Sequence, residues 1–237
     1  HSLIEMPKND YRPRRDDPRV GYFMEQVTDQ TSISAVPYKD KIHRWHLVKK
    51  DPHAAISEPV EPIVWWVENT TPHEYRQTIV EAGLKWNEAF EKAGFKNAVQ
   101  MKIMPDDATW DPADIRYNVI RWVSSANPTY GAIGPSFVNP RTGQILGADI
   151  TIEWFSGSAT PIWDELYNDI TGHSQSSLHF PGMDQQHYAH CTLASELKAQ
   201  LMTGMTVLDA TDASPEAVSE MHKQFLTYLI MHEMGHT

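Results

Sequence analysis

The chain has 237 residues, 41% of them hydrophobic and 22% charged, a composition that is ordinary for a globular protein with a sizeable core. Its formal net charge of -11 argues against a nucleic-acid partner, because phosphate binding needs clustered Lys and Arg. No apolar run approaches the roughly 18 residues that cross a bilayer, so no transmembrane segment is expected. The chain begins with His1 and shows no signal peptide, and we therefore expect it to be a piece of a longer protein.

The first 61 residues predict an N-terminal arm. Residues 1–61 are rich in Pro, Asp and Arg and show no sustained helical period. Two strand-like runs lie near residues 20–27 and 42–49, and a linker punctuated by proline ends at Pro62.

A strand, a helix and further strands are expected next, which predicts a βαβ unit and hence an α/β fold. The continuous apolar run at residues 62–67 fits a strand buried on both faces. Residues 71–74 (TPHE) predict a capping box that starts a helix, and Gly94 supplies its left-handed stop. The next strands are expected at residues 99–103 and 114–123.

A hairpin and an insertion follow. Residues 139–143 (NPRTG) are good turn formers, and residues 145–154 predict a long strand. Residues 155–213 predict an insertion of uncertain structure, part of it helical because leucine recurs at every fourth position from Leu193 to Leu201. The histidines between His173 and His190 allow a second metal site. A polar surface insertion is favoured instead, because their spacing is not distinctive.

The last helix carries the most informative motif. It is expected to begin at Ser214, and its end reads YLIMHEMGHT. Because residues four apart stack on one face of a helix, His232 and His236 can direct two imidazoles at one ion, with Glu233 beside them. His-Glu-x-x-His is the zinc motif of metalloproteases. In this chemistry zinc activates a bound water, Glu takes its proton, and the hydroxide attacks a peptide carbonyl.

The alternative is that both histidines are ordinary core residues. They share one helical stripe with Val218, Phe225 and Leu229, and a single histidine that continues such a stripe is usually a hydrogen-bonded core residue. Two histidines at this spacing with an adjacent Glu are rarer, and the polar trio would be unfavourable to bury without a partner. The motif therefore favours a metal site.

Several long segments, in order, resemble the metzincin zinc metallopeptidases. That family has a twisted, mostly parallel mixed sheet, an antiparallel edge strand, a long first helix and an active-site helix, and it continues the motif with x-x-Gly-x-x-His. Residues 86–98 (WNEAFEKAGFKNA), 114–123 (DIRYNVIRWV) and 134–145 (GPSFVNPRTGQI) are similar to one branch of it, large exported bacterial proteases with flanking domains of unknown function. The resemblance runs over nearly the whole chain.

The resemblance implies a zinc-dependent endopeptidase that acts on protein or peptide substrates in the periplasm or at the cell surface. It implies that His232 and His236 bind zinc and that Glu233 is the general base. It puts the third ligand beyond Thr237, so residues 62–237 would be the N-terminal part of a catalytic domain without its C-terminal subdomain. A chain that ends at Thr237 is then expected to bind zinc weakly and to be inactive.

The family plan also implies that an extended substrate lies beside the edge strand, whose candidate binding residues are Gly131, Ala132, Ile133 and Gly134. Two alternatives stay open. One is a non-catalytic cell-surface binding or scaffold module that keeps the fold. The other is a zinc peptidase whose third ligand is a Glu on a later helix.

Overall fold

The structure is a computed structural model, and it describes residues 3–17, 19–125, 132–153 and 193–237. The chain divides into two compact units. The first contains residues 1–121, 134–150 and 226–237, and the second contains residues 122–133 and 151–225. The predicted arm is part of the first unit, and so are all three residues of the zinc motif.

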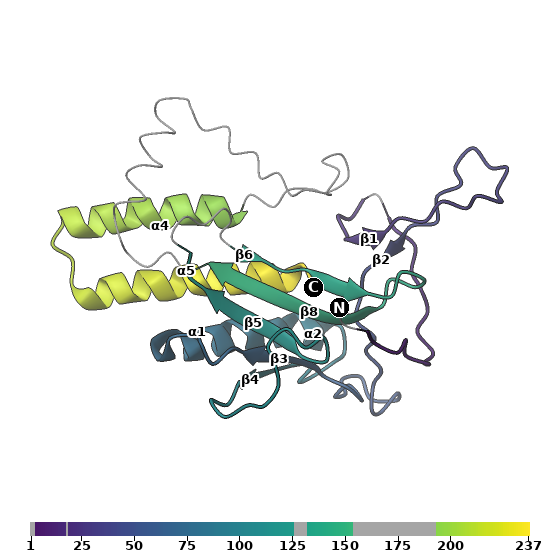
Figure 1. The fold of residues 1–237 in the computed structure, drawn as a ribbon, viewed down its shortest axis with the longest axis horizontal. Helices are drawn as coiled ribbons and strands as arrows, with labels where there is room; N and C mark the ends of the chain where they lie inside the picture. Colours follow the sequence, from purple (N-terminus) through teal and green to yellow (C-terminus); the bar gives the residue numbers. More distant parts are fainter. Residues whose placement is uncertain (1–2, 18, 126–131, 154–192) are drawn as a thin grey trace. The chain divides into compact units, whose positions relative to one another are not determined.

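The protein is a mixed α/β fold with a mostly parallel sheet and a few helices, as the sequence predicts at this level (Figure 1). The strand order is β4-β3-β5-β8-β6, and β7 pairs separately with β8. Parallel pairing joins β3 to both β4 and β5, whereas β6 and β7 run antiparallel to β8. The strands are β3 (Ile63–Val67), β4 (Val99–Ile103), β5 (Asn118–Val123), β6 (Ala132–Ile133), β7 (Ser136–Val138) and β8 (Ile145–Glu153).

The crossover between β3 and β4 is helical, which confirms the strand–helix–strand prediction. It consists of α1 (His73–Leu84) and α2 (Trp86–Lys92), and α1 packs against both strands. Gly94 has a φ of 92°, so it provides the left-handed stop that the sequence predicts. The predicted capping box is wrong. Pro72 occupies the N-cap without a side-chain bond, and the hydroxyl of Thr71 is buried without a hydrogen-bond partner.

The arm forms a small antiparallel ladder of β1 (Met24–Glu25) and β2 (Lys41–Ile42). Both strands are shorter than the runs predicted at residues 20–27 and 42–49, because the rest of that backbone makes only isolated bridges or no regular pairing. Ile42 is buried, and the β7–β8 turn lies directly against it. Gly143, with a φ of 77°, makes this close approach possible, since a Cβ there would collide with the Ile42 carbonyl.

Two long helices complete the described part of the chain. They are α4 (Leu193–Ala210) and α5 (Pro215–Gly235), as the leucine repeat and the Ser214 cap predict. Within the second unit, a Cβ on Gly204 would lie only 2.6 Å from the sulfur of Met221, so glycine lets the two helices pack closely there. None of the helices in the described ranges is long and apolar enough to span a membrane. The histidines between His173 and His190 lie outside the described residues.

Candidate metal and catalytic site

The last two turns of α5 hold the motif residues on a well-buried support. Ser214 begins the helix and accepts a hydrogen bond from the Ala217 amide at 3.3 Å. In the first unit, four buried apolar side chains anchor the helix: Leu226, Leu229, Ile230 and Met234. The motif is thus carried by a helix end whose apolar face is packed in the core, which limits its movement.

The two histidines are neighbours, one turn apart. The ring centroids of His232 and His236 are 4.5 Å apart and the planes are nearly perpendicular, at 86°. Burial lowers the pKa of both imidazoles, and the proximity of His232 lowers that of His236 further. Both rings are therefore biased toward the neutral form, which is the form that binds a metal ion.

One nitrogen of this pair lacks a partner. Nε2 of His236 is buried and makes no hydrogen bond. Buried polar atoms are nearly always hydrogen-bonded, so an orphaned imidazole nitrogen is unusual and unfavourable. A metal ion at Nε2 would satisfy it, and the donor set of two imidazoles suits zinc.

Glu233 lies beside the histidines and is only 3% exposed. Burial raises the pKa of its carboxyl from 4.5 to about 7, and no other cause contributes to the shift. A carboxyl with a pKa near neutrality can both accept and release a proton at physiological pH. The sequence predicts a general base at Glu233, and the buried environment of this carboxyl suits that role.

Gly134 is the one predicted substrate-binding residue that the first unit brings against the motif. An ideal Cβ at Gly134 would lie 3.1 Å from the Glu233 carbonyl oxygen and 3.5 Å from its Oε2. The same atom would also lie 3.4 Å from Ile150, which is fully buried in β8. Only glycine lets the edge segment approach the Glu233 carboxyl this closely without displacement of a neighbour.

The other predicted substrate-binding residues belong to the second unit or are not described. Ala132 and Ile133 form β6 and pair with Ile152 and Thr151 of β8, so they do lie on an edge strand. Gly131 lies outside the described residues.

Sequence reasoning missed three aromatic residues around the end of α5. The indole N–H of Trp86 donates to the Met231 carbonyl at 3.1 Å, and that of Trp45 donates to the Thr237 carbonyl at 2.9 Å. The ring of Phe23 packs edge-on against His236, with centroids 5.1 Å apart. No local pattern could have indicated these contacts, because they join segments far apart in the sequence.

The ligand set within the described ranges is incomplete. No three His, Cys, Asp or Glu side chains among these residues come together closely enough to hold a metal ion. His232 and His236 are the two candidate ligands that the last turns of α5 hold next to each other.

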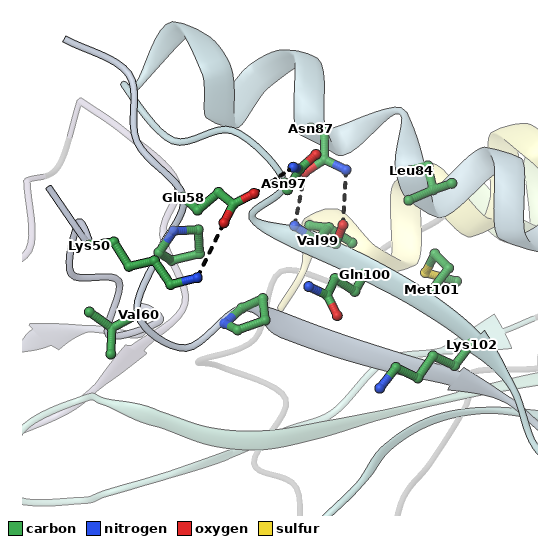
Figure 2. Close-up of a pocket in the computed structure, with 12 residues that line it drawn as sticks. Lys50, Glu58, Val60, Leu84, Asn87, Asn97, Val99, Gln100, Met101 and Lys102 are labelled. Atoms are coloured by element: carbon green, nitrogen blue, oxygen red, sulfur yellow. Dashed lines mark hydrogen bonds and ion pairs between the residues drawn. The ribbon is translucent and has the colours of Figure 1, made fainter. Parts of the chain in front are cut away.

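A pocket of about 400 Å³ lies elsewhere, beside β4 (Figure 2). Its polar groups are largely paired with one another. Glu58 accepts hydrogen bonds from Lys50 at 3.2 Å and from Asn97 at 3.1 Å, and the Asn87 amide bonds both backbone groups of Val99 at 2.9 Å. None of the motif residues lines it. This pocket and the motif at the end of α5 are therefore separate features of the first unit.

Comparison with known proteins gives one match. A family model described as Domain of unknown function (DUF5117) matches residues 1–50. No curated protein and no solved structure matches the chain. The matched segment is the larger part of the arm and includes both Phe23 and Trp45, whereas the motif at the end of α5 lies outside it.

Proposed function

We propose that this protein is a zinc-dependent endopeptidase of the metzincin type, in which His232 and His236 bind zinc and Glu233 is the general base. The resemblance puts the third protein ligand after Thr237. It also leads us to propose an exported bacterial enzyme that works in the periplasm or at the cell surface on protein or peptide substrates.

One observation carries this proposal: the last turn of α5 concentrates buried polar groups that the described residues leave uncompensated. Nε2 of His236 has no hydrogen-bond partner, and burial alone sets the raised pKa of Glu233. A turn that served only stability would pair such groups. A cation between the imidazoles would satisfy the nitrogen and favour the charged form of the carboxylate.

The chain's own residues then divide the work. Zinc, when bound, lowers the pKa of water and polarises a peptide carbonyl. The neutral imidazoles of His232 and His236 hold the ion through ring nitrogens on a rigid helix face. Glu233 accepts a proton from the attacking water and returns it to the leaving amine, a cycle for which a pKa near 7 is suitable.

The contact between Gly134 and Glu233 supports a place for the substrate. An extended peptide beside the edge segment at Gly134 would bring its backbone next to the Glu233 carboxyl.

Peptide hydrolysis tests the proposal directly. The full-length natural protein, with whatever residues its gene encodes after Thr237, is loaded with zinc and incubated with a peptide library. We expect Glu233→Gln to retain zinc and to lose at least about 10³-fold in kcat/KM, since a general base contributes on that order. Glu220→Gln, at an exposed position on the same helix, is the matched control and should stay fully active.

Two outcomes would contradict the proposal. If Glu233→Gln is as active as the wild type, Glu233 is not the base. If the zinc-loaded wild type cleaves no peptide, the motif belongs to a non-catalytic module that keeps the fold.

A further inference from the structure

The arm is built into the first unit by backbone pairing. Arg44 forms a parallel bridge with Gln144: its amide donates to the Gly143 carbonyl at 3.0 Å, and its carbonyl accepts from the Ile145 amide at 3.0 Å. The arm segment thus continues the pairing at the start of β8. The guanidinium of Arg44 also lies over the Tyr11 ring, 4.4 Å from the centroid. These contacts fix the arm backbone at Arg44.

From this anchored segment, two aromatic side chains contact the end of α5. Trp45 follows Arg44 directly, and its indole N–H donates to the Thr237 carbonyl at 2.9 Å. Phe23 is held by the His43 amide, which donates to its carbonyl at 2.8 Å, and its ring packs on His236 at an interplanar angle of 62°. Both contacts therefore start from backbone that is itself hydrogen-bonded.

These contacts act on the part of α5 that most needs support. The last carbonyls of a helix have no intrahelical partner, so the final turn frays unless other groups satisfy it. An imidazole that binds a metal also needs neighbours that fix its ring orientation. Trp45 holds the Thr237 carbonyl just beyond Gly235, the last residue of α5, and Phe23 restricts the ring of His236.

We propose that Phe23 and Trp45 are positioning residues of the metal site, and hence that the segment matched by DUF5117 helps to hold the metal-binding end of α5. This inference rests on the proposed function, because it takes His236 as a metal ligand. Neither residue touches the metal or the substrate: Phe23 acts through the ring of His236, and Trp45 through the backbone of Thr237.

Metal affinity and the cobalt spectrum test this role without reliance on activity. Phe23→Leu and Trp45→Phe are made in the full-length natural protein. Zinc affinity is measured by competition with a chromophoric chelator, and the visible absorption of the cobalt-substituted protein reports ligand geometry. We expect each variant to bind zinc about tenfold more weakly, the size of effect typical for groups that orient ligands. We expect Phe23→Leu to change the cobalt spectrum and Phe23→Tyr, which keeps the ring, to restore it.

Matched controls separate positioning from general loss of stability. Tyr38→Leu makes the same type of change at an arm residue that is 61% exposed. Trp110→Phe removes an indole that stacks on Tyr117, with ring centroids 4.0 Å apart, a contact that includes no residue of α5. Both controls should keep wild-type zinc affinity. Trp45→Phe, which loses little more than the N–H donor, carries the test if Phe23→Leu does not fold.

The outcomes distinguish this inference from the proposed function. If the wild type binds zinc and cleaves peptides, but both variants match its zinc affinity and cobalt spectrum, then Phe23 and Trp45 are not positioning residues and the function stands. If the controls weaken zinc binding as much as the variants do, the effect is general destabilisation and the inference is overturned. If the wild type binds no zinc, both proposals fail.

Discussion

Two regions of the first unit shield polar groups from solvent at least in part, and they differ in how those groups are paired. In the centre of the sheet, Asn118 donates to the Val64 carbonyl at 2.7 Å and accepts from the Ala148 amide at 3.0 Å. Burial raises the pKa of Asp149 there, but the Val119 amide and the charge of Arg121 oppose the shift. In the last turn of α5, nothing opposes the shift of Glu233.

The difference shows how structural and functional polarity can be told apart. The sheet centre uses each polar group to join strands, so removal of one group leaves its partners unsatisfied. At the end of α5, an orphaned Nε2 of His236 and an uncompensated carboxyl lower the stability of the metal-free fold. Removal of a polar group from the sheet centre should therefore lower the free energy of unfolding. Removal of one from the end of α5 should raise the free energy of unfolding of the metal-free protein.

The largest expected effect is in the sheet. Asn118→Ala should lower the free energy of unfolding by about 4 kcal/mol, because two backbone groups next to a buried strand lose their partner. Asn87→Ala is the matched control. Asn87 also makes two hydrogen bonds to backbone groups, both of Val99, but it borders the pocket beside β4, where water can replace it. We expect it to lose about 1 kcal/mol. Equal losses in urea unfolding would contradict the contrast.

Substitution of Glu233 should instead raise the free energy of unfolding, by an amount that depends on pH. Because the folded protein holds the Glu233 proton more tightly than the unfolded chain, this residue's contribution to stability falls as the pH rises from about 4.5 to about 7. The lowered pKa values of His232 and His236 act in the other direction below pH 6.5. The difference in unfolding free energy between the wild type and Glu233→Gln isolates the contribution of the carboxyl, because both proteins contain the same histidines.

In metal-free buffer with a chelator, Glu233→Gln should therefore gain on the wild type by about 3 kcal/mol between pH 4.5 and pH 8. Chemical unfolding at several pH values measures this gain. A difference that stays constant with pH would show that Glu233 is not a buried, uncompensated carboxyl.

A smaller gain is expected at His236. His236→Leu removes the orphaned Nε2 and should stabilise the metal-free protein by about 2 kcal/mol. His43→Leu is the control, because Nε2 of His43 lies 3.3 Å from a carboxylate oxygen of Glu25 and its removal leaves that carboxylate without its partner. It should not stabilise the protein. If both substitutions shift the thermal midpoint downward, His236 has a structural partner that the account overlooks.

The smallest effect is expected at Gly134. Gly134→Ala should lower stability by about 1 kcal/mol, since the new methyl group presses on the Glu233 carbonyl and Ile150. Peptide hydrolysis should fall more than stability suggests, because the methyl group also approaches the Glu233 carboxyl. Gly21→Ala, where a Cβ meets nothing within 4 Å, should leave both unchanged. An unaltered kcat/KM in Gly134→Ala would show that the substrate does not lie beside the edge segment at Gly134.

Sequence reasoning succeeded where the physical cause is local. Gly94 and Gly143 adopt the left-handed conformations that their turns need, and the i, i+4 spacing does bring His232 and His236 together. It failed at a strand boundary, where a turn replaces the expected start of the strand. The strand predicted from Asp114 begins only at Asn118, because Asp114 turns the chain: its carbonyl accepts a hydrogen bond from the Tyr117 amide.

The surroundings of the site were the least predictable part. Trp45 and Thr237 are separated by 192 positions, and only the folded chain brings the indole to that carbonyl. Glu233 is likewise buried with Gly134 close beside it, a contact that the motif itself does not indicate. Spacing predicted which side chains could act, whereas tertiary contacts set their electrostatics.

Calorimetric titration of the metal-free, full-length natural protein with zinc tests the central claim most directly. The account predicts one tight site per chain in the wild type, its retention in Glu233→Gln and its loss when His232 and His236 are both replaced by Ala. Absence of zinc binding in the wild type, or a site that survives the double replacement, would contradict the assignment of the end of α5 as a metal site.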